Sequence, residues 1–247
     1  MRDWSPFLGL PLWCWLFVIP SVFMVVCYFA ARGLKPVLKP VWRVLDGFYL
    51  AGGIIAALAL ITILLLIVAQ MITRWSGVAF PGSTDFAGYA MATASFLAFA
   101  HALNRGAHIR VSILLNANNF TKYWLDALAM LIAAITATYF ARYAIKTNFV
   151  SKLINDRTQG QDQVPEWVLS IFAMFKTSPS NWADLWAKTG DAWVFTPIWL
   201  PQLPMSIGTI LLAVALWDNL SRLLVLGKSQ IESETLDDGV VEGEAVR

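Results

Sequence analysis

Apolar residues in this chain run together in long stretches that polar residues rarely interrupt. A helix needs about 20 apolar residues to cross the hydrocarbon core of a bilayer. Five stretches are long enough: Phe7–Ala31, Phe48–Ile72, Phe86–Leu103, Tyr123–Ile145 and Leu203–Val225. The pattern predicts an all-α integral membrane protein with about five transmembrane helices and, between them, interfacial amphipathic helices.

The first apolar stretch is either a signal peptide or a retained helix. Its apolar part is longer than that of a signal peptide, and basic residues follow it instead of a small-residue cleavage site. We therefore expect a retained helix that bends at Pro20. Cys14 and Cys27 both lie in this stretch. In a helix they would be about 20 Å apart, beyond the reach of a disulfide, so we expect both to be small core residues.

The linker Lys35–Phe48 has a helical periodicity of its own. One stripe is basic (Lys35, Lys39 and Arg43), and another is apolar (Val37, Val41, Leu45 and Phe48). This pattern favours a short helix lying in the membrane interface. An ordinary basic flank of the next span is the alternative.

The segment 146–200 predicts two further helices. Pro165 and Glu166 suit the start of the first helix, and Ser180 suits the cap of the second, which Gly190 would end. Five of the 12 tryptophans fall in this segment, among them Trp182 and Trp186. Such a surface is typical either of an anchor in the bilayer interface or of a contact with a partner protein.

The distribution of Lys and Arg predicts the orientation. The linker 32–43 has four basic residues and the loop 73–85 only Arg74, whereas the loop 104–122 has three: Arg105, Arg110 and Lys122. Cytoplasmic loops carry the excess of Lys and Arg, so the N-terminus is expected outside the cell membrane and the C-terminus in the cytoplasm. The tail 227–247 is acidic and poor in aromatics, and we expect it to be disordered.

Composition narrows the class of protein. The chain is 58% hydrophobic and 14% charged, with a mean hydropathy of +0.61. A soluble domain is nearer half apolar and a quarter charged, so this is the composition of a membrane protein. The net charge of +2 is too small for nucleic-acid binding, and no basic stripe with interleaved aromatic residues occurs.

Candidate chemistry is sparse. The centres of the five stretches hold no Asp, Glu, Lys, Arg or His, although a self-sufficient carrier normally places ionisable groups at membrane depth. The cysteines are far along the chain from His101 and His108, which argues against a zinc site. On one helix these histidines would share a face about 10 Å apart, unable to hold a haem iron from opposite sides. We expect no catalytic residue, no cofactor and no metal site, and we interpret Gly52-Gly53 as a close helix contact.

Polar residues recur in a set order after the second apolar stretch. Arg74-Trp75 is an Arg–aromatic pair, Asp85 opens the next stretch, and the run Arg105-Gly-Ala-His108-Ile-Arg110-Val follows it. In this order and spacing, the chain resembles the small (Q-type) membrane subunit of the tripartite ATP-independent periplasmic (TRAP) transporters. The resemblance covers roughly Val41–Ile145 and, more loosely, the last span. Ser112 stands where the family usually has Asp, Asp85 stands where Glu is usual, and the first stretch is additional to the usual four spans.

The resemblance implies a non-catalytic scaffold within a transporter. Such a subunit pairs with a large membrane subunit that carries the substrate and sodium sites, and a periplasmic solute-binding protein delivers the solute. An ion gradient drives uptake, mostly of organic acids, across the bacterial inner membrane. A self-sufficient small carrier or channel is the alternative function, and a membrane enzyme is a more remote one.

The resemblance and the charge pattern also suggest residues that hold the subunit against its surroundings. We expect Arg105, His108 and Arg110 to form a cytoplasmic turn that bonds helix-end carbonyls, lipid phosphates or a partner carboxylate; a plain positive anchor is the alternative for the arginines. Asp85 would either cap its helix or pair with Arg74. In the outer segment, Trp182 and Trp186 are the candidates for a partner or lipid contact.

These expectations divide the chain into five parts. They are an extra N-terminal transmembrane helix (1–31), a family core with three transmembrane helices (32–145), a periplasmic aromatic-rich helical insert (146–200), a last transmembrane helix (201–226) and an acidic cytoplasmic tail (227–247).

Overall fold

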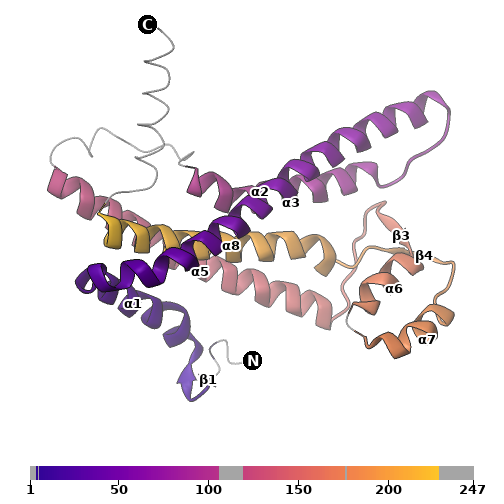
Figure 1. Cartoon of the computed structure of the whole chain (residues 1–247). Helices are drawn as coiled ribbons and strands as arrows, with labels where there is room; N and C mark the ends of the chain where they lie inside the picture. Colours follow the sequence, from indigo (N-terminus) through magenta and orange to yellow (C-terminus); the bar gives the residue numbers. More distant parts are fainter. Residues whose placement is uncertain (1–3, 5, 106–118, 176, 228–247) are drawn as a thin grey trace, which may run out of the picture.

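The computed structural model describes residues 4, 6–105, 119–175 and 177–227. Among them, four helices are long and apolar enough to cross a membrane: α2 (Ala31–Trp75), α3 (Ser83–Asn104), α5 (Asn119–Leu153) and α8 (Trp199–Leu226) (Figure 1). The predicted all-α membrane class is confirmed. The loop with His108 and Arg110 and the tail predicted to be disordered after Gly227 lie outside the described residues.

The first apolar stretch is shorter as a helix than predicted. It opens with a hairpin of β1 (Pro6–Phe7) and β2 (Leu10–Pro11), turned at Leu8 and Gly9, which both have positive φ. A π-helix, η1 (Cys14–Val18), then leads into α1 (Ile19–Phe29), with Pro20 in its first turn. The helical part Cys14–Phe29 is about 24 Å long, short of the roughly 30 Å hydrocarbon core. The helix is therefore shorter than the expected span Phe7–Ala31, because the hairpin takes up the start of the apolar run.

The predicted interfacial helix and the second span form one continuous helix. α2 has 45 residues and is about 68 Å long, roughly twice the thickness of the hydrocarbon core. Pro36 and Pro40 lie inside it and each removes a backbone hydrogen bond. The helix continues past them because Leu38 and Trp42 pack with Cys27 of α1 and with the end of α8. We call residues 31–48 the α2 arm.

Small residues bring the spans close together. A Cβ on Gly52 would lie 3.0 Å from the carbonyl oxygen of Leu97, and one on Gly53 would lie 2.7 Å from the ring of His101. Both neighbours belong to α3, so the predicted close contact at Gly52-Gly53 is confirmed, and His101 packs between helices. On α8, Gly208 lies against the backbone of Phe96 in the same way. An alanine-rich core also joins α3, α5 and α8. Its alanines are Ala100, Ala134, Ala137, Ala141, Ala213 and Ala215.

A small outer unit connects α5 to α8. It contains the antiparallel strands β3 (Gln163–Pro165) and β4 (Trp193–Phe195), and between them α6 (Glu166–Met174), the 3-10 turn η2 (Pro179–Asn181) and α7 (Trp182–Ala187) (Figure 1). Both predicted helices are present, and α6 starts at Glu166 as expected. Ser180 does not cap α7, since it lies within η2 and Asn181 takes the cap position. The strands were not predicted.

The contact at Gly208 provides a test of how tightly α3 and α8 pack. We expect Gly208→Ala to lower the free energy of unfolding by about 1–3 kcal/mol, because the new methyl group would overlap the carbonyl group of Phe96. Gly88→Ala on α3 is the matched control, since a Cβ there meets nothing within 4 Å. Thermal unfolding in detergent measures both, and equal midpoints for the two variants would contradict the close contact.

Candidate functional site

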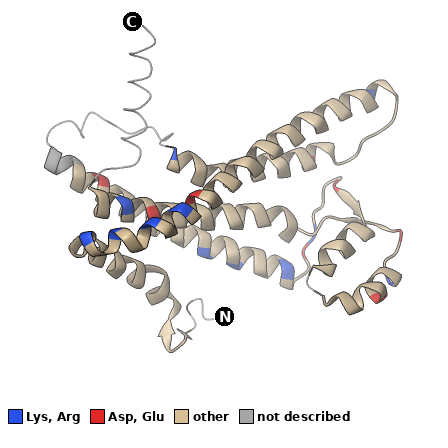
Figure 2. Cartoon of the chain, viewed as in Figure 1, with Lys and Arg blue, Asp and Glu red and all other residues tan. Residues whose placement is uncertain are grey.

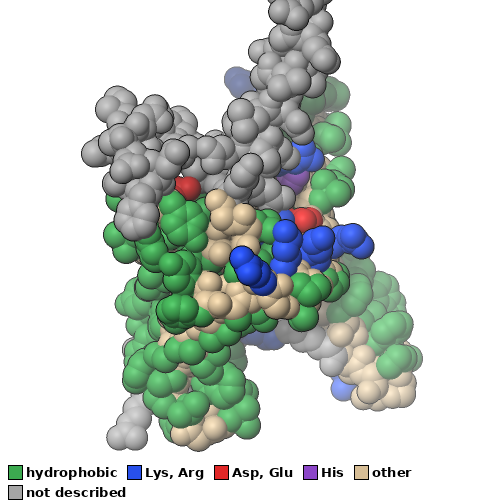
Figure 3. All heavy atoms as spheres, turned by 60° about the vertical axis from the view of Figure 1, so that its left-hand side comes forward, with side chains coloured by type: hydrophobic (Ala, Val, Ile, Leu, Met, Phe, Trp, Pro, Cys, Tyr) green, Lys and Arg blue, Asp and Glu red, His purple; other side chains and the backbone are tan. Residues whose placement is uncertain are grey.

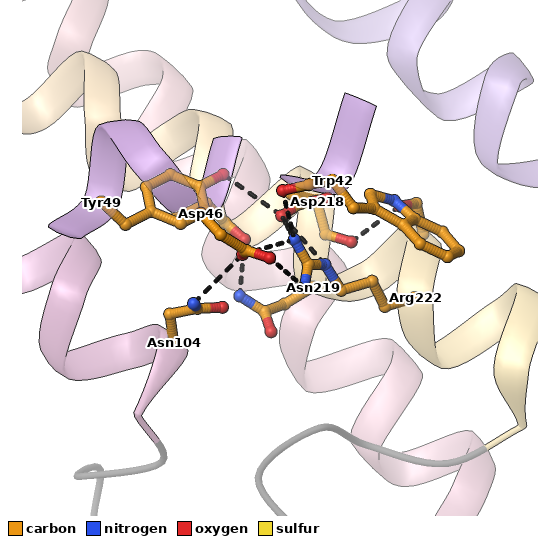
Figure 4. Close-up of polar contacts among 9 residues, drawn as sticks. Trp42, Asp46, Tyr49, Asn104, Asp218, Asn219 and Arg222 are labelled. Carbon is orange, nitrogen blue, oxygen red and sulfur yellow. Dashed lines mark hydrogen bonds and ion pairs between the residues drawn. The ribbon is translucent and has the colours of Figure 1, made fainter. Parts of the chain in front are cut away.

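The most polar site inside the bundle is centred on Arg222 of α8. Its Nη2 atom lies 2.7 Å from Oδ1 of Asp46 and 2.8 Å from Oδ2 of Asp218, and it also donates to the carbonyl oxygen of Trp42 at 3.2 Å. Asp218 and Arg222 are four residues apart on α8 and therefore share a face. Asp46 and Trp42 come from the α2 arm. One guanidinium group thus ties the arm to the end of α8 (Figure 4).

Neutral donors complete this site. The Tyr49 hydroxyl donates to Oδ2 of Asp218 at 3.3 Å, and the Asn104 amide donates to Oδ1 of Asp46 at 3.2 Å. The indole of Trp42 donates to Ser221 at 3.1 Å, and the guanidinium of Arg222 also lies 5.5 Å from the centre of the same ring system. The site therefore joins α2, α3 and α8. We call it the polar cluster: Trp42, Asp46, Tyr49, Asn104, Asp218, Ser221 and Arg222.

Burial makes the polar cluster energetically important. The side chains of Arg222 and Asp218 are 5% and 2% exposed, while that of Asp46 is 38% exposed. A buried charge is tolerated only when it is paired and hydrogen-bonded. Figure 2 shows acidic and basic residues meeting where the α2 arm crosses α8. These ion pairs hold helices together, and their ionic groups are engaged with each other.

A second polar site fixes the outer unit to α3. Asp162 is fully buried, and its carboxylate accepts hydrogen bonds from Tyr89 at 2.5 Å and from Thr158 at 2.7 Å. Burial by itself raises the pKa of Asp162, but the hydrogen bonds from Tyr89, Thr158 and Thr196 outweigh it and hold this pKa below its usual range. Nearby, Asp85 of α3 accepts a hydrogen bond from the backbone N–H of Gln161 at 3.0 Å. We call this the outer contact.

Two glycines allow the backbones of the outer contact to approach. Gly82 has a φ of +75°, and a Cβ there would lie 2.6 Å from the carbonyl oxygen of Gln161. A Cβ on Gly160 would lie 2.7 Å from the Asp85 carboxylate. Both sides of the contact thus depend on a missing side chain, and Gly82 also depends on the conformational freedom of glycine.

The charged residues that the sequence suggested as contact residues do not form one site. Asp85 neither caps α3, whose cap is Gly82, nor pairs with Arg74, which is exposed in the last turn of α2. Its carboxylate bonds the outer unit instead, because that loop folds back over the start of α3. Arg105 is exposed at the end of α3, and His108 and Arg110 lie outside the described residues.

The predicted tryptophans of the outer unit are both exposed. The indole of Trp182 donates to the carbonyl oxygens of Met174 and Thr177, which ties α7 to the end of α6. Trp186 lies one turn further along α7. The outer unit thus presents Trp182 and Trp186 on a fold that its own hydrogen bonds hold together.

Sequence reasoning missed the polar cluster. Asp46 stands just before the predicted span Phe48–Ile72 and Asp218 near the end of the predicted span Leu203–Val225, but both lie inside helices, α2 and α8. One signal was available: Asp218 and Arg222 stand one turn apart on an otherwise apolar helix, where a charged pair needs a reason. Asp162 and Tyr89 gave no such signal, because they are 73 residues apart in the chain.

Two further features of the described residues bear on what the protein can bind. Among these residues, no three His, Cys, Asp or Glu side chains are placed to hold a metal ion. A groove of about 450 Å³ lies between α1, α5 and α8, and its walls are almost entirely apolar, including Met24, Trp124 and Leu220. Such a groove suits a lipid chain or an apolar side chain better than a polar substrate.

Removing the central charge of the polar cluster is expected to destabilise the bundle. Arg222→Met leaves Asp218 buried and uncompensated, and breaking a buried pair in this way costs about 3–5 kcal/mol. The double variant Arg222→Met with Asp218→Asn should recover a large part of the loss. Arg43→Met, the same change on an exposed arginine of the α2 arm, is the control. Thermal unfolding in detergent would disprove the role of the cluster if Arg222→Met and Arg43→Met behaved alike.

The outer contact is expected to weaken in acid. The pKa of Asp162 is lower in the folded than in the unfolded protein, so its contribution is present above the unfolded value of about 3.9 and is lost as the pH falls through the folded value. Asp162→Asn should lose the contribution already at neutral pH. Hydrogen–deuterium exchange of residues 158–164 measures it as protection relative to free peptide. Asp156→Asn, an exposed acid of the same segment, should leave protection unchanged; equal effects of the two variants would refute the prediction.

The comparisons with known proteins agree with the resemblance seen in the sequence. Residues 63–177 match the family model of the tripartite ATP-independent periplasmic transporters, DctQ component. The match begins inside α2, later than the predicted start at Val41, and runs through α3, α5 and α6. No curated protein and no solved structure matches the chain. The predicted family is confirmed: residues 63–177 are a DctQ domain, the small membrane component of a TRAP transporter.

Proposed function

We propose that this chain is the scaffold partner of a large membrane subunit in ion-gradient-driven uptake of an organic acid. Sodium is the proposed coupling ion, and a periplasmic solute-binding protein is the proposed donor of the solute. The DctQ domain supports membership of a tripartite system. The observation that carries the scaffold role is the polar cluster, where Asp46, Asp218 and Arg222 form ion pairs that join helices.

The surface of α2 supports a partner in the membrane. Beyond the α2 arm, an exposed apolar ridge follows alternating steps of four and three residues: Ile54, Leu58, Ile61, Leu65, Val68 and Ile72. This spacing is the one by which helices pack side by side. Figure 1 shows the hairpin of α2 and α3 extending past the α5–α8 pair, where another membrane protein has room to pack against it.

The proposed orientation follows the count of Lys and Arg. The α2 arm and the turn with Arg105, His108 and Arg110 would face the cytoplasm, and the outer unit would face the periplasm of a bacterial inner membrane. Arg74 and Asp85 would then lie at the periplasmic ends of their helices. In this arrangement Trp182 and Trp186 would lie where the outer unit meets the large subunit or the lipid interface.

A self-sufficient carrier is the second candidate, and one observation favours it. Asp46, Arg142 and Asp218 lie inside α2, α5 and α8 and not at the ends of these helices. Ionisable groups at membrane depth are typical of transport paths. Against this, the guanidinium of Arg222 already engages both carboxylates of the polar cluster.

Reconstitution separates the two candidates. We expect proteoliposomes with this chain alone to show no gradient-driven uptake of labelled dicarboxylates or sugar acids. Uptake is expected only after the neighbouring large membrane protein and the binding protein are added. Uptake by the isolated chain would favour the carrier, and failure to co-purify with the large protein would contradict the scaffold role.

A further inference from the structure

The α2 arm exposes two opposite faces that the fold itself does not cover. Its third face is fixed: Leu38 and Trp42 are buried against α1 and α8, and the carbonyl oxygen of Trp42 accepts a hydrogen bond from Arg222. Because this face is held, the arm cannot rotate about its own axis. The fold therefore fixes the direction in which each open face points.

The first open face is basic. Four cations follow one another at intervals of three or four residues, which places them on one side of a helix: Arg32, Lys35, Lys39 and Arg43. All four are exposed. No ion pair is formed by any of the four within the described part of the chain. Figure 3 shows Lys and Arg side chains gathered on one face around an acidic one.

The acid nearest this face is already engaged. Asp46 stands three residues after Arg43, at a spacing that would allow an ion pair along the helix. Its two oxygens instead accept from Arg222, at 2.7 and 3.3 Å, and one also accepts from Asn104. The polar cluster thus leaves the positive charge of the arm uncompensated.

The second open face is apolar. Val37, Val41, Val44 and Phe48 succeed one another at intervals of four, three and four residues, and all four are exposed. On a helix, this stripe lies opposite the basic one. The arm also continues directly into the apolar part of α2, so it starts at the edge of the hydrocarbon core. A basic stripe on one side of a helix and an apolar stripe on the other, at the end of a membrane span, fit a helix segment that meets the headgroup region of the bilayer.

We propose that the α2 arm is a binding surface for anionic phospholipids. Arg32, Lys35, Lys39 and Arg43 attract the headgroups, while Val37, Val41, Val44 and Phe48 lie among the upper parts of the acyl chains. Phospholipid is the occupant that meets both faces at once. The acidic tail after Gly227 is the competing occupant of the basic face, and truncation at Gly227 tests it.

Lipid selectivity tests the proposal on the full chain in vesicles of equimolar phosphatidylcholine and phosphatidylglycerol. Spin-labelled lipids of each kind report the relative association with the protein. We expect phosphatidylglycerol to be preferred at low salt by about fivefold or more, the factor that one Lys or Arg near a charged surface contributes. The preference should decrease as salt is added, because the Debye length shortens from about 10 Å at 0.1 M to about 3 Å at 1 M.

Matched variants locate the effect. Lys35→Gln with Lys39→Gln should remove most of the preference, whereas Arg74→Gln with Lys188→Gln, an equal loss of charge on exposed residues elsewhere, should keep it. Equal association of the two lipids with the wild-type chain would overturn the proposal. If the preference appeared only after truncation at Gly227, the tail would be the occupant of the basic face, and the proposal would be wrong.

A second measurement reads the orientation of the arm. In a Cys14→Ser, Cys27→Ala background, spin labels at Val41→Cys and at Lys39→Cys report access to oxygen, which concentrates in the bilayer, and to a water-soluble nickel chelate. We expect oxygen access at position 41 and nickel access at position 39. Nickel access at both positions would place the arm in water and refute the proposal. Neither experiment requires the large subunit, so their outcome is independent of the proposed scaffold role.

Discussion

The structure depends on how a buried guanidinium group is compensated. Arg222 has little access to water, and an uncompensated charge in that position costs several kcal/mol. The cost is avoided only while Asp46, Asp218 and the carbonyl oxygen of Trp42 stay where they are. That requirement fixes the angle at which the α2 arm crosses α8, and Asn104 brings the end of α3 to the same place. A single charge therefore sets the relative positions of three helices that apolar packing alone would hold less specifically.

Close packing between α2, α3 and α8 extends this arrangement along the membrane-spanning parts of the helices. Apolar contacts between helices gain little in lipid, so helices in a bilayer associate through small residues that let their backbones approach. Gly52, Gly53 and Gly208 provide such contacts on both sides of α3. At the far end, Asp162 and Asp85 tie the outer unit to the first turns of α3 by hydrogen bonds. Helix α3 is thus held at both ends and along its length.

The sequence was sufficient for the features that depend on local pattern. Apolar runs predicted the helices that cross the membrane, Gly52-Gly53 predicted a close contact, Pro165 and Glu166 predicted the start of α6, and the order of Arg74, Asp85, Arg105 and His108 predicted the family. The rest depended on long-range partners. Asp46 and Arg222 are 176 residues apart, and no periodicity links them. The short strands β3 and β4 likewise pair residues far apart in the chain, such as Gln163 with Phe195, next to the hydrogen bond from Thr158 to Thr196.

The two polar sites differ in how the family match relates to them. Tyr89, Asp85 and Asp162, which form the outer contact, all lie within the matched residues 63–177. Of the polar cluster, only Asn104 does, since Trp42, Asp46, Tyr49, Asp218 and Arg222 lie before or after the match. Most of the polar cluster therefore lies outside the matched residues, and its role follows from its burial and its charges. By taking Asp46 out of reach of Arg43, the same ion pairs that fix the α2 arm also leave its cations unpaired. The stability of the polar cluster and the positive charge on the surface of the α2 arm thus have one physical cause.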